Sequence, residues 1–508
     1  MTSRSTLNEG ISLRELLPEA KFFGAQDIRV RSYSADSQRC LPGDLFAAIA
    51  GLDNDGHDFI MDALQRGASA ILSERRLPIN QPSCVVKNSR EAYGKICHAL
   101  ADHPSQDVKV IGVTGTNGKT TVCALIKAVL EEAGAKVGSS SSFGYDNGYD
   151  QQRWNCTTPG AAIQADLLSR MRFNGCSHAV LEVSSQALAL DDLAGIELDA
   201  VAITNIRQNH TNFHGSARNY FKAKQKVLHY LRDTGFAVFN ADDPTSNRLM
   251  EGFSLPSLSI AMHGVGEITA SVVERHKSEQ TFLISAGGES AVVCTRMIGD
   301  QHIYNCLTAT AVGLVYGIPL QTIVRGLESV QSLPSRMQRI ECGQPFGVFV
   351  DQATTHDGLA MALKALRRVT HGRVICVYGA DHGGDGDRRP MLGRVIEKGA
   401  DVALLTSSGQ AHESPLEIVH DLLDGFAKPA KAHIIPTRSE AIRWAISQAE
   451  TGDTILLAGQ KDRFADAEFG DTEEHSDREI AQRLLYEMAP QLASSDYDAE
   501  VIAFPKLL

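Results

Sequence analysis

The sequence of 508 residues lacks the marks of secreted, membrane-spanning and nucleic-acid-binding proteins. Its ten cysteines form no CxxC pair and follow no secretory leader, so we expect reduced thiols in the core. No run of about 20 apolar residues is present, which argues against membrane insertion. Acidic residues outnumber basic ones by 61 to 49, and the net charge of −12 disfavours a general nucleic-acid partner, although a local phosphate site needs only local positive charge. We therefore expect a cytoplasmic protein.

The chain also lacks an internal repeat, and its pattern divides it into three regions. Residues 1–105 alternate short apolar runs with turn signals, and residues 106–334 change to strand–loop–helix units. After a Pro/Ser break at residues 333–335, residues 335–508 contain a further series of strands and helices, typical of a Rossmann-like domain. Strands that alternate with helices predict an α/β fold with parallel sheets covered on both faces. The acidic stretch at residues 471–477 is typical of an exposed loop.

Short apolar, β-branched runs mark the buried strands of the second and third regions. The run at residues 108–113 predicts one strand, and the apolar spacing from Thr120 to Ala133 predicts the helix that follows it. Further strands are expected at residues 178–182, 200–204, 236–240, 347–350, 374–378, 402–405 and 454–458.

A glycine-rich loop between that strand and that helix carries the strongest chemical signal. The loop reads Thr114-Gly115-Thr116-Asn117-Gly118-Lys119-Thr120-Thr121. Glycines let backbone N–H groups approach phosphate oxygens, the helix N-terminus adds positive potential, Lys119 supplies a full charge, and Thr120 is placed to bind Mg²⁺. The common spacing would place a glycine at position 113, where this chain has Val113. The sequence therefore predicts a variant phosphate-binding loop.

This variant loop resembles that of the Mur ligases and of the related folate-polyglutamate and cyanophycin ligases. Other motifs resemble the MurE type, which adds the third amino acid to the peptidoglycan stem peptide. They are Asp36-Ser37, Pro42–Phe46, Asp55–His57, Thr157–Pro159, Glu182–Ser185, Thr204-Asn205, His210, His214-Gly215, Tyr220-Phe221, Lys224, Asn240–Pro244, Arg336-Met337, Asp351, Arg389-Pro390 and Ser476–Glu479. The resemblance spans nearly the whole chain. It implies three domains: a uridine-nucleotide-binding domain (1–105), a central ATP-binding phosphate-loop domain (106–334) and a Rossmann-like amino-acid-binding domain (335–508).

The implied reaction is ADP-forming amide ligation in peptidoglycan synthesis. The carboxylate of UDP-MurNAc-L-Ala-D-Glu attacks the γ-phosphate of ATP, and the amine of an amino acid then displaces phosphate from the acyl phosphate. Because two anions must meet, metal ions should carry much of the stabilisation. By resemblance Glu182 and His210 hold one Mg²⁺, Thr120 holds another, and Lys224 is N6-carboxylated. Judged without the family, Lys224 would belong to a solvated helix face.

The resemblance also assigns residues to each ligand. Catalysis is assigned to Lys119, Lys224 and His210, and metal binding to Thr120, Glu182, His210 and Lys224. ATP binding is assigned to Gly115, Thr116, Asn117, Gly118, Lys119, Thr120, Thr121, Asn305, Arg336 and Asp351. Binding of the two substrates is assigned to Ser37, Thr157, Thr158, Ser184, Arg389, Gly459 and Arg463. A monomer is expected.

Departures from the family pattern cluster on the substrate side. They include Cys156, Gln186, Asp192, Asn209, His302, residues 352–356, residues 408–411 and residues 460–463. Asp192 reverses the charge of a family arginine that contacts the acceptor substrate. Ala411 stands where the diaminopimelate enzymes keep an arginine, and Arg463 where they keep an acidic group, so diaminopimelate activity would depend on Arg463 or Arg389. The amino acid therefore stays open, as do a Mur-like ligase with other substrates and a nucleotide-binding pseudoenzyme.

Overall fold

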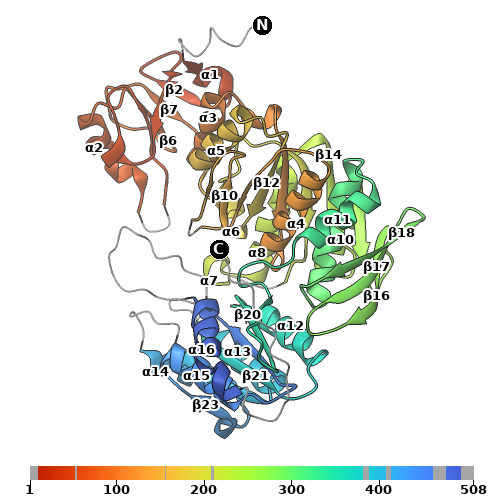
Figure 1. Cartoon of the computed structure of the whole chain (residues 1–508). Coiled ribbons are helices and arrows are strands. Elements are labelled where there is room, and N and C mark those ends of the chain that lie inside the picture. The colour runs from red at the N-terminus through yellow and green to blue at the C-terminus, as the bar shows by residue number, and fades with distance from the viewer. Residues whose placement is uncertain are drawn as a thin grey trace. The chain divides into compact units, whose positions relative to one another are not determined.

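The computed structural model describes residues 10–51, 54–154, 156–207, 211–380, 388–407, 414–460 and 476–492 (Figure 1). The chain divides into two compact units. The first unit comprises Met1–Ala270, Ile284–Ala291 and Tyr304–Ser329, and the second comprises Ser271–Leu283, Val292–Ile303 and Val330–Leu508. The domain boundaries expected after residues 105 and 334 stay a prediction.

The first region of the chain forms a five-stranded sheet in the order β2-β7-β6-β5-β4. Strands β4 to β7 pair in parallel, while β2 runs antiparallel to β7 at one edge. Its core includes Leu45, Leu72 and Ile96, which are almost completely buried. The elements are β1 Ile11–Ser12, α1 Leu13–Leu16, β2 Lys21–Phe23, β3 Arg29–Val30, β4 Tyr33–Ser34, β5 Leu45–Ala47, α2 Ile60–Gln65, β6 Ala70–Ser73, β7 Ser83–Val85 and α3 Ser89–Leu100.

Helix α3 packs closely against the segment that follows helix α6 (Ser185–Ala189) in the second region. A Cβ atom on Gly94 would lie 2.5 Å from the carbonyl oxygen of Ala194, and one on Gly195 would lie 2.9 Å from the carbonyl oxygen of Gly94. Asn88, which caps α3, donates a hydrogen bond from Nδ2 to Oδ2 of Asp191 at 2.9 Å. Both close approaches exclude a side chain, so this packing requires glycine on each side.

The central sheet has the order β11-β10-β9-β12-β8-β13-β14-β15-β16-β17-β18. Strands β9, β12, β8, β13, β14 and β15 are parallel to one another, and β10 and β11 extend one edge as antiparallel strands. The strands are β8 Lys109–Thr114, β9 Val137–Ser141, β10 Gly144–Asp146, β11 Gln151–Gln152, β12 His178–Val183, β13 Leu198–Ile203, β14 Leu231–Asn240, β15 Ser257–Ala261, β16 Ile268–Arg275, β17 Gln280–Ala286 and β18 Glu289–Thr295. The expected strands at β8, β12, β13 and β14 are confirmed, and β8 lies between β12 and β13.

Helices of the second region follow the strands in the expected alternation. Helix α4 packs against α11 as well as against β8, β9 and β12. The helices are α4 Lys119–Glu132, α5 Ala161–Phe173, α6, α7 Thr211–His214, α8 Ala217–Gln225, α9 Pro244–Glu251, α10 Asp300–Val315 and α11 Leu320–Ser329.

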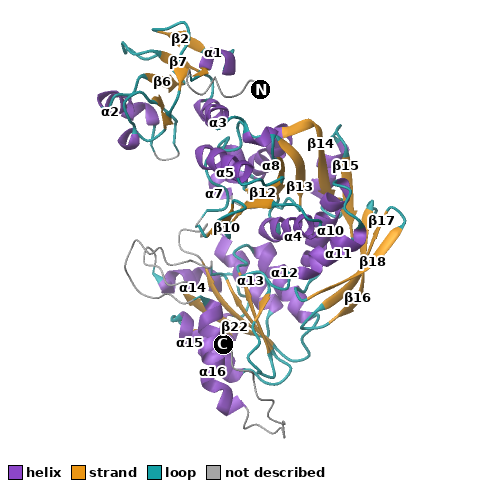
Figure 2. Ribbon diagram, turned by 45° about the horizontal axis from the view of Figure 1, so that its top comes forward, coloured by secondary structure: helices purple, strands orange, loops and turns teal. Residues whose placement is uncertain are grey.

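The C-terminal sheet has the order β19-β20-β24-β21-β22-β23, in which every pair except the antiparallel β19–β20 is parallel. Helices α12, α13 and α14 pack on one face of it, and α15 and α16 pack on the other, as Figure 2 shows. This doubly wound arrangement confirms the Rossmann-like prediction. The elements are β19 Gln338–Arg339, β20 Gly347–Asp351, α12 His356–Arg367, β21 Val374–Ala380, α13 Arg389–Gly399, β22 Val402–Ser407, α14 Pro415–Leu423, β23 Ala432–Ile434, α15 Arg438–Gln448, β24 Thr454–Ala458 and α16 Asp477–Leu492.

Two expectations from composition meet different outcomes. Within the described ranges, no helix combines the length and the apolar character needed to cross a membrane. All ten cysteines are free thiols, but Cys156 and Cys294 are exposed, so the expectation that every cysteine is a core residue was wrong for these two.

Candidate active site

The phosphate loop joins the C-terminal end of β8 to the first residue of α4. Gly118 has φ of 87° and Gly115 has φ of 153°, both in the region that favours glycine. A Cβ atom on Gly115 would lie 1.9 Å from Oγ1 of Thr204, a distance that no side chain tolerates. The loop therefore approaches the end of β13 as closely as a backbone allows.

Two residues just after β13 hold the loop in shape. The backbone N–H groups of Thr116 and Asn117 donate to Asn205, to its carbonyl oxygen at 2.8 Å and to its Oδ1 at 3.0 Å. In return, Oγ1 of Thr204 and Nδ2 of Asn205 donate to the carbonyl oxygen of Asn117, at 2.6 and 3.1 Å. These side-chain contacts preorganise the loop, a role that the sequence analysis did not assign to Thr204 and Asn205.

Lys119 and Thr120 begin helix α4 where the helix dipole is positive. Nζ of Lys119 donates to the carbonyl oxygen of Thr116 at 3.2 Å, so the lysine side chain folds back over the loop. Thr120 and Thr121 are each 4% exposed. The arrangement suits a phosphate group, which would meet the ammonium group and the helix N-terminus together.

Glu182 lies opposite Val113 in the parallel pairing of β12 with β8, which places its carboxylate beside the start of the phosphate loop. The side chain is 2% exposed. Its Oε2 accepts hydrogen bonds from the backbone N–H and the hydroxyl of Ser142, at 2.9 and 3.1 Å. A carboxylate held at the ends of parallel strands is a suitable ligand for a divalent cation.

Thr157, Thr158 and Ser184, which were predicted to bind substrate, gather at the same end of β12. Oγ1 of Thr158 donates to the carbonyl oxygen of Glu182 at 2.8 Å and accepts the N–H of Ser184 at 2.9 Å. Oγ1 of Thr157 lies 3.3 Å from the hydroxyl oxygen of Ser142, whose one proton goes to Glu182, so the Thr157 hydroxyl is the donor to Ser142. Ser184 also caps helix α6 through its side chain. These contacts bring the Thr-Thr-Pro loop to the carboxylate.

Lys224 lies within this site and not on a solvated helix face, so the reading from its local sequence alone was wrong. It is 1% exposed, and its Nζ donates to Oγ1 of Thr114 at 3.3 Å. Burial moves the pKa of Lys224 well below its usual value, and the charge of Lys119 moves it in the same direction, while Glu182 partly opposes them. A lysine in such surroundings is easily deprotonated.

His214, the last residue of α7, contacts helices α6 and α8. Its Nε2 lies 3.0 Å from Oγ of Ser185, and its ring meets the ring of Tyr220 edge to face. Burial lowers the pKa of His214, as does the nearby Lys224. His210, the predicted metal ligand, lies outside the described residues, as do Arg463 and Ala411.

The implied Mg²⁺ can be tested against the donors present. Glu182 offers a buried carboxylate and Thr120 a hydroxyl, which are the oxygen ligands that Mg²⁺ prefers. The described residues contain no group of three or more His, Cys, Asp or Glu side chains able to hold a metal by themselves. An ammonium at Lys224 would repel the ion, whereas a carboxylated Lys224 would attract it. The donors therefore fit Mg²⁺ together with phosphate oxygens and a carboxylated lysine.

The second unit contains two of the residues predicted to bind ATP, Arg336 and Asp351. Asp351 ends β20, where its carboxylate accepts the N–H groups of Met337 and Ala353 at 2.7 and 2.9 Å. Burial raises the pKa of Asp351, while Arg336 and these N–H groups lower it. Ser335 and Met337, on either side of Arg336, have φ of 48° and 47°, a strained conformation of the kind found at binding sites.

Two further predicted substrate residues lie in the second unit. Arg389, at the start of α13, is 5% exposed and donates from a guanidinium nitrogen to Oδ2 of Asp421 at 2.8 Å. Gly459 follows β24 with φ of 90°, and a Cβ atom there would lie 2.3 Å from the carbonyl oxygen of Gly379. Asn305 is almost completely buried in the first unit, on α10, and Ser37 is buried at the start of the short helical turn Ser37–Arg39 that follows β4 in the chain.

Asp477 corrects the reading of the acidic stretch as solvated charge. The side chain is 4% exposed and forms a two-point ion pair with Arg438, in which Nε and a terminal nitrogen donate at 3.0 and 2.6 Å. Arg438 also donates to the carbonyl oxygen of Ala458 at the end of β24 at 3.1 Å. Through Arg438, Asp477 therefore fixes the start of α16 to the C-terminal end of the inner strand β24.

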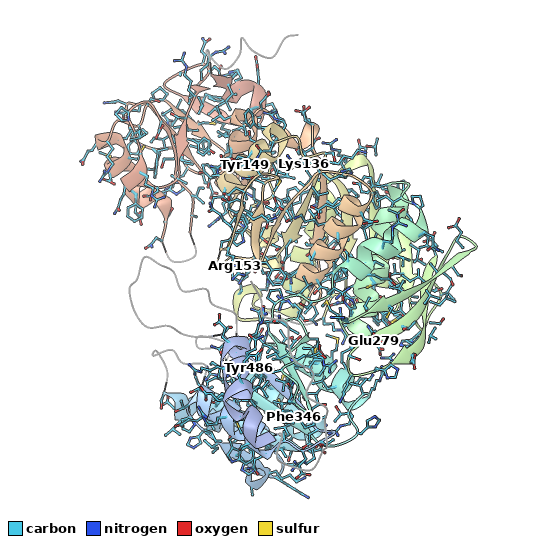
Figure 3. The ribbon with its side chains drawn as sticks, in the orientation of Figure 1. Lys136, Tyr149, Arg153, Glu279, Phe346 and Tyr486 are labelled. Carbon is cyan, nitrogen blue, oxygen red and sulfur yellow. The ribbon has the colours of Figure 1, made fainter. Side chains whose placement is uncertain are left out.

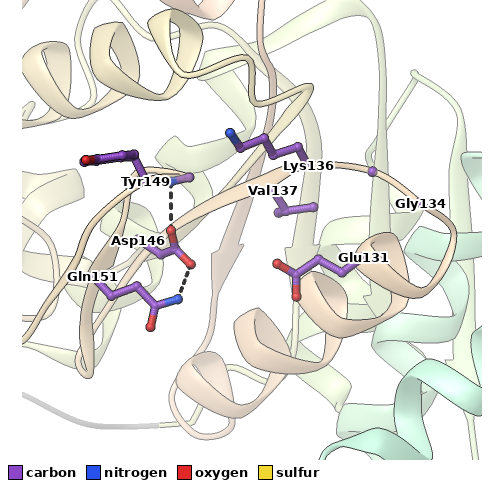
Figure 4. Close-up of a pocket in the computed structure, with 9 residues that line it drawn as sticks. Glu131, Gly134, Lys136, Val137, Asp146, Tyr149 and Gln151 are labelled. Carbon is purple, nitrogen blue, oxygen red and sulfur yellow. Dashed lines mark hydrogen bonds between the residues drawn. The ribbon is translucent and has the colours of Figure 1, made fainter.

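A separate polar pocket lies at the far end of α4, away from the phosphate loop. It is lined by Glu131, Lys136, Asp146, Tyr149 and Gln151, among others (Figure 4). Asp146 accepts a side-chain hydrogen bond from Gln151 at 2.7 Å, and Lys136 and Tyr149 mark this corner in Figure 3. Its charges are mixed, so it favours neither an anion nor a cation.

Comparison with known proteins agrees with this geometry. Residues 29–102 match the Mur ligase family catalytic domain, residues 113–313 the Mur ligase middle domain, and residues 335–461 the Mur ligase glutamate ligase domain. The chain belongs to the Mur ligase family, and its fold is the three-domain α/β architecture of that family.

Individual relatives narrow the resemblance. The chain is 34% identical over 470 residues to a UDP-N-acetylmuramoyl-L-alanyl-D-glutamate–2,6-diaminopimelate ligase from Syntrophomonas wolfei, covering 91% of this chain and 96% of that protein. It is 34% identical over 459 residues to the enzyme of the same name from Geobacillus kaustophilus, covering 89% and 94%. A solved structure of an enzyme of that name has a TM-score of 0.66 at 25% identity, covering 89% of this chain and 93% of the other.

Proposed function

We propose that this chain is an ATP-dependent, ADP-forming ligase that adds the third amino acid to UDP-MurNAc-L-Ala-D-Glu in peptidoglycan synthesis. The observation that carries the proposal is the meeting of the phosphate loop, Glu182 and Lys224 at adjoining ends of β8 and β12. The names of the relatives supply the acceptor. The expected setting is the cytoplasm, where the protein acts as a monomer on small-molecule substrates.

The first step needs charge neutralisation more than covalent help. The substrate carboxylate attacks the γ-phosphorus, the bond to the bridging oxygen of ADP breaks, and an acyl phosphate forms. Lys119 and the N-terminus of α4 offset the negative charge of the phosphates, and the preorganised loop needs little reorganisation. The amine of the amino acid then attacks the acyl carbon and expels phosphate.

Thr120 and Glu182, with His210, would hold Mg²⁺. A bound ion would screen the charge of the phosphates from the incoming carboxylate. Glu182 keeps its orientation because both of its bonds from Ser142 converge on one oxygen, which leaves the other oxygen of the carboxylate for the ion.

Lys224 is proposed to be N6-carboxylated. Its neutral amine, favoured by the lowered pKa, attacks CO₂ and loses one proton, which gives a carbamate and converts a repelled cation into an anion. The positive charge of Lys119 repels an ammonium group on Lys224 but attracts a carbamate there. Burial limits hydrolysis, because water has little access to a side chain that is 1% exposed.

The amino acid is the open part of the proposal. The relatives act on diaminopimelate by name, but Ala411 and Arg463 depart from the residues expected for that substrate. We therefore propose that any diaminopimelate activity relies on Arg463 or Arg389. Arg389 has a ready partner in Asp421, and a substrate carboxylate would compete with that carboxylate for the guanidinium.

Release of ADP tests the proposal. Purified enzyme with ATP, Mg²⁺ and UDP-MurNAc-dipeptide should release ADP when one amino acid of a panel is added, namely diaminopimelate, lysine, ornithine or a smaller amino acid. The product should gain the mass of that amino acid. Diaminopimelate ligation that survives in both Arg463→Ala and Arg389→Ala would contradict the pocket assignment. The absence of ADP with every amino acid would contradict the function.

One observation favours a second candidate, a Mur-like ligase with a different acceptor. Asp192 lies beside the Thr-Thr-Pro loop: its Oδ1 is 3.9 Å from the place of a Cβ atom on Gly160. A carboxylate there would repel an acceptor carboxylate. A panel of nucleotide-sugar peptides and acyl amino acids in the same assay would separate the two candidates. A pseudoenzyme is disfavoured, because Lys119, Glu182 and Lys224 are all in place.

A further inference from the structure

Helix α8 presents two buried side chains on one face. Tyr220 and Lys224 are four residues apart, so they lie one above the other along the helix. Tyr220 is 2% exposed and Lys224 is 1% exposed. Nζ of Lys224 lies 5.2 Å from the centre of the Tyr220 ring. The ring therefore forms one wall of the space around the amine.

The hydroxyl of Tyr220 reaches the phosphate loop, where it lies 2.9 Å from Oγ1 of Thr116. The direction of this hydrogen bond follows from the other partners of Thr116. Its Oγ1 accepts the N–H of Arg207 at 2.8 Å and lies 3.0 Å from the carbonyl oxygen of Arg207, which can only accept. The one hydroxyl proton of Thr116 goes to that carbonyl, so Tyr220 must be the donor to Thr116.

Lys224 makes a similar contact with the hydroxyl of Thr114, two residues before Thr116. The hydroxyl of Thr114 donates to the carbonyl oxygen of Val183 at 2.9 Å, so its oxygen is left to accept from Nζ of Lys224 at 3.3 Å. The two side chains of α8 thus contact β8 and the loop at alternate residues. Lys224, a candidate catalytic residue, makes one of these contacts. Tyr220, which has no assigned part in the reaction, makes the other.

We propose that Tyr220 is a positioning residue that ties α8 to the phosphate loop and thereby sets both the loop and Lys224. This inference rests on the proposed function for its kinetic readout, but its structural content concerns nucleotide binding and the state of Lys224. Loss of the hydroxyl removes one of the two anchors of α8. It also removes one of the two donors to Oγ1 of Thr116, the other being the N–H of Arg207, so the loop is less firmly held when phosphate arrives.

The test is Tyr220→Phe, which keeps the ring against Lys224 and His214 and removes the one hydroxyl. The control is Tyr316→Phe. Tyr316 is also in the first unit, and its buried hydroxyl has no hydrogen-bond partner in the described part of the chain. Three quantities are measured on both variants: the Kd of a fluorescent ATP analogue, the carbamate signal of protein in ¹³C-bicarbonate by NMR, and kcat with KM for ATP.

Loss of one hydrogen bond should change these quantities by about three- to tenfold. In Tyr220→Phe we expect a weaker Kd for the analogue, a smaller carbamate signal that recovers at higher bicarbonate, and a lower kcat. The control should match the wild type. A purely structural role would lower the melting temperature and leave Kd and the carbamate signal unchanged, and that result would overturn the inference.

The outcomes also separate this inference from the proposed function. If no amino acid elicits ADP release from the wild type, the proposed function fails, and Kd and the carbamate signal still decide the role of Tyr220. If the wild type has no carbamate signal, carboxylation of Lys224 fails, and an unchanged Kd in Tyr220→Phe then overturns the tie to the loop.

Discussion

Lys119 and Lys224 belong to the same candidate site, but their surroundings differ. Lys119 begins a helix and folds over the loop, whereas Lys224 is sealed inside the protein with one hydroxyl as its acceptor. The first is placed for a constant positive charge. The second is destabilised as a cation and is placed for covalent change.

Lys119→Ala should separate chemistry from folding. Loss of the charge that faces the transferring phosphate should lower kcat/KM by at least about a hundredfold. The free energy of unfolding should change by no more than about 0.5 kcal/mol, because the side chain packs over a loop and not in a core. Thermal melting and an ADP-release assay on the same preparation measure both. Near-normal ligation by the variant would end the assignment.

Lys224→Ala should be almost inactive, and a high concentration of bicarbonate or a short-chain carboxylate such as acetate should partly restore activity. The reason is that an added anion can occupy the space left by a carbamate and support the cations there. Lys222→Ala is the matched control, since Lys222 lies on the same helix but is exposed. Equal activity of the two variants would count against carboxylation. Failure of every added anion to restore the activity of Lys224→Ala would also count against it.

Asp192→Asn should stabilise the protein at neutral pH. Burial raises the pKa of Asp192 to about 6, with Arg90 opposing this and Asp191 adding to it. The native state therefore holds the proton to higher pH than the unfolded chain, so stability is lost as pH rises from about 4 to about 6. Above that window the variant should melt higher, by an amount equivalent to about 1–2 kcal/mol after allowance for solvent screening.

The same two proteins should melt alike near pH 4, where the native carboxyl is protonated. Asp166→Asn provides the control, because Asp166 is an exposed carboxylate paired with Arg170 on α5. Melting curves at pH 4, 6 and 8 make the comparison. A gain for Asp192→Asn that is the same at all three values would show that the carboxyl does not titrate as described.

At the scale of elements, the phosphate loop shows how neighbouring strands shape a site. Gly115→Ala would drive a methyl group into Thr204, so the loop must shift away from the Asn205 contacts. ATP affinity should fall by more than about tenfold, since preorganised N–H donors are displaced. Gly134→Ala tests strain alone, because Gly134 also has positive φ, 86°, but no atom lies within 4 Å of its added Cβ. Calorimetric titration with ATP would measure both, and comparable affinities would refute the clash.

Many of the parallel strands were predictable because both of their faces are buried, whereas β9, β15 and β23 were not predicted although they are parallel too. β8, β12, β20, β21, β22 and β24 lie within two residues of the expected runs, since a continuous apolar, β-branched stretch has few other solutions. The first half of β14, Leu231–Gly235, was missed because two of its residues are exposed and break that pattern. Strands β16 to β18 were missed because polar residues, such as Thr269 and Ser271 in β16 and Thr281 in β17, interrupt their apolar runs.

The candidate site was predictable only in part. Lys119 and Glu182 follow from a glycine-rich loop and from the end of a strand, which are local signals. The burial of Lys224 and the contacts of Ser142, Asn205 and Tyr220 are tertiary, and no local pattern carries them. Asp477 was misread because an acidic run gives no sign that one of its members meets Arg438.

For the whole molecule, buried histidines predict sensitivity to acid. Burial lowers the pKa of His98, His178 and His302 to about 4, and neither ring nitrogen of His98 has a hydrogen-bond partner among the described residues. Unfolded histidine binds its proton near pH 6.5, so the unfolded chain holds more protons between about 6.5 and 4. Stability should therefore fall as pH falls through that window, by up to about 1.4 kcal/mol per pH unit for His98 and for His302, and by less for the partly exposed His178, where solvent screens the charge.

Urea unfolding at pH 7 and pH 5 measures this loss. His98→Leu should reduce the difference between the two midpoints, whereas replacement of the exposed His276 by leucine should leave it unchanged. Midpoints that do not move between pH 7 and pH 5 in the wild type would show that these histidines titrate normally.

The paired glycines at α3 bear on how such a protein can be recombined. Gly94 and Gly195 belong to different regions of the sequence, yet Gly94 leaves room for the backbone of Ala194, and Gly195 leaves room for the backbone of Gly94. A chimera that takes its first 100 or so residues from a relative separates the two partners at the junction. If the donor has alanine at the position of Gly94, the methyl group of that alanine clashes with Ala194, even when every residue at the junction is compatible. Whether two parents are compatible thus depends also on Gly195, which lies far along the chain from the crossover. Exchange of the first region succeeds only between parents that both have glycine at positions 94 and 195.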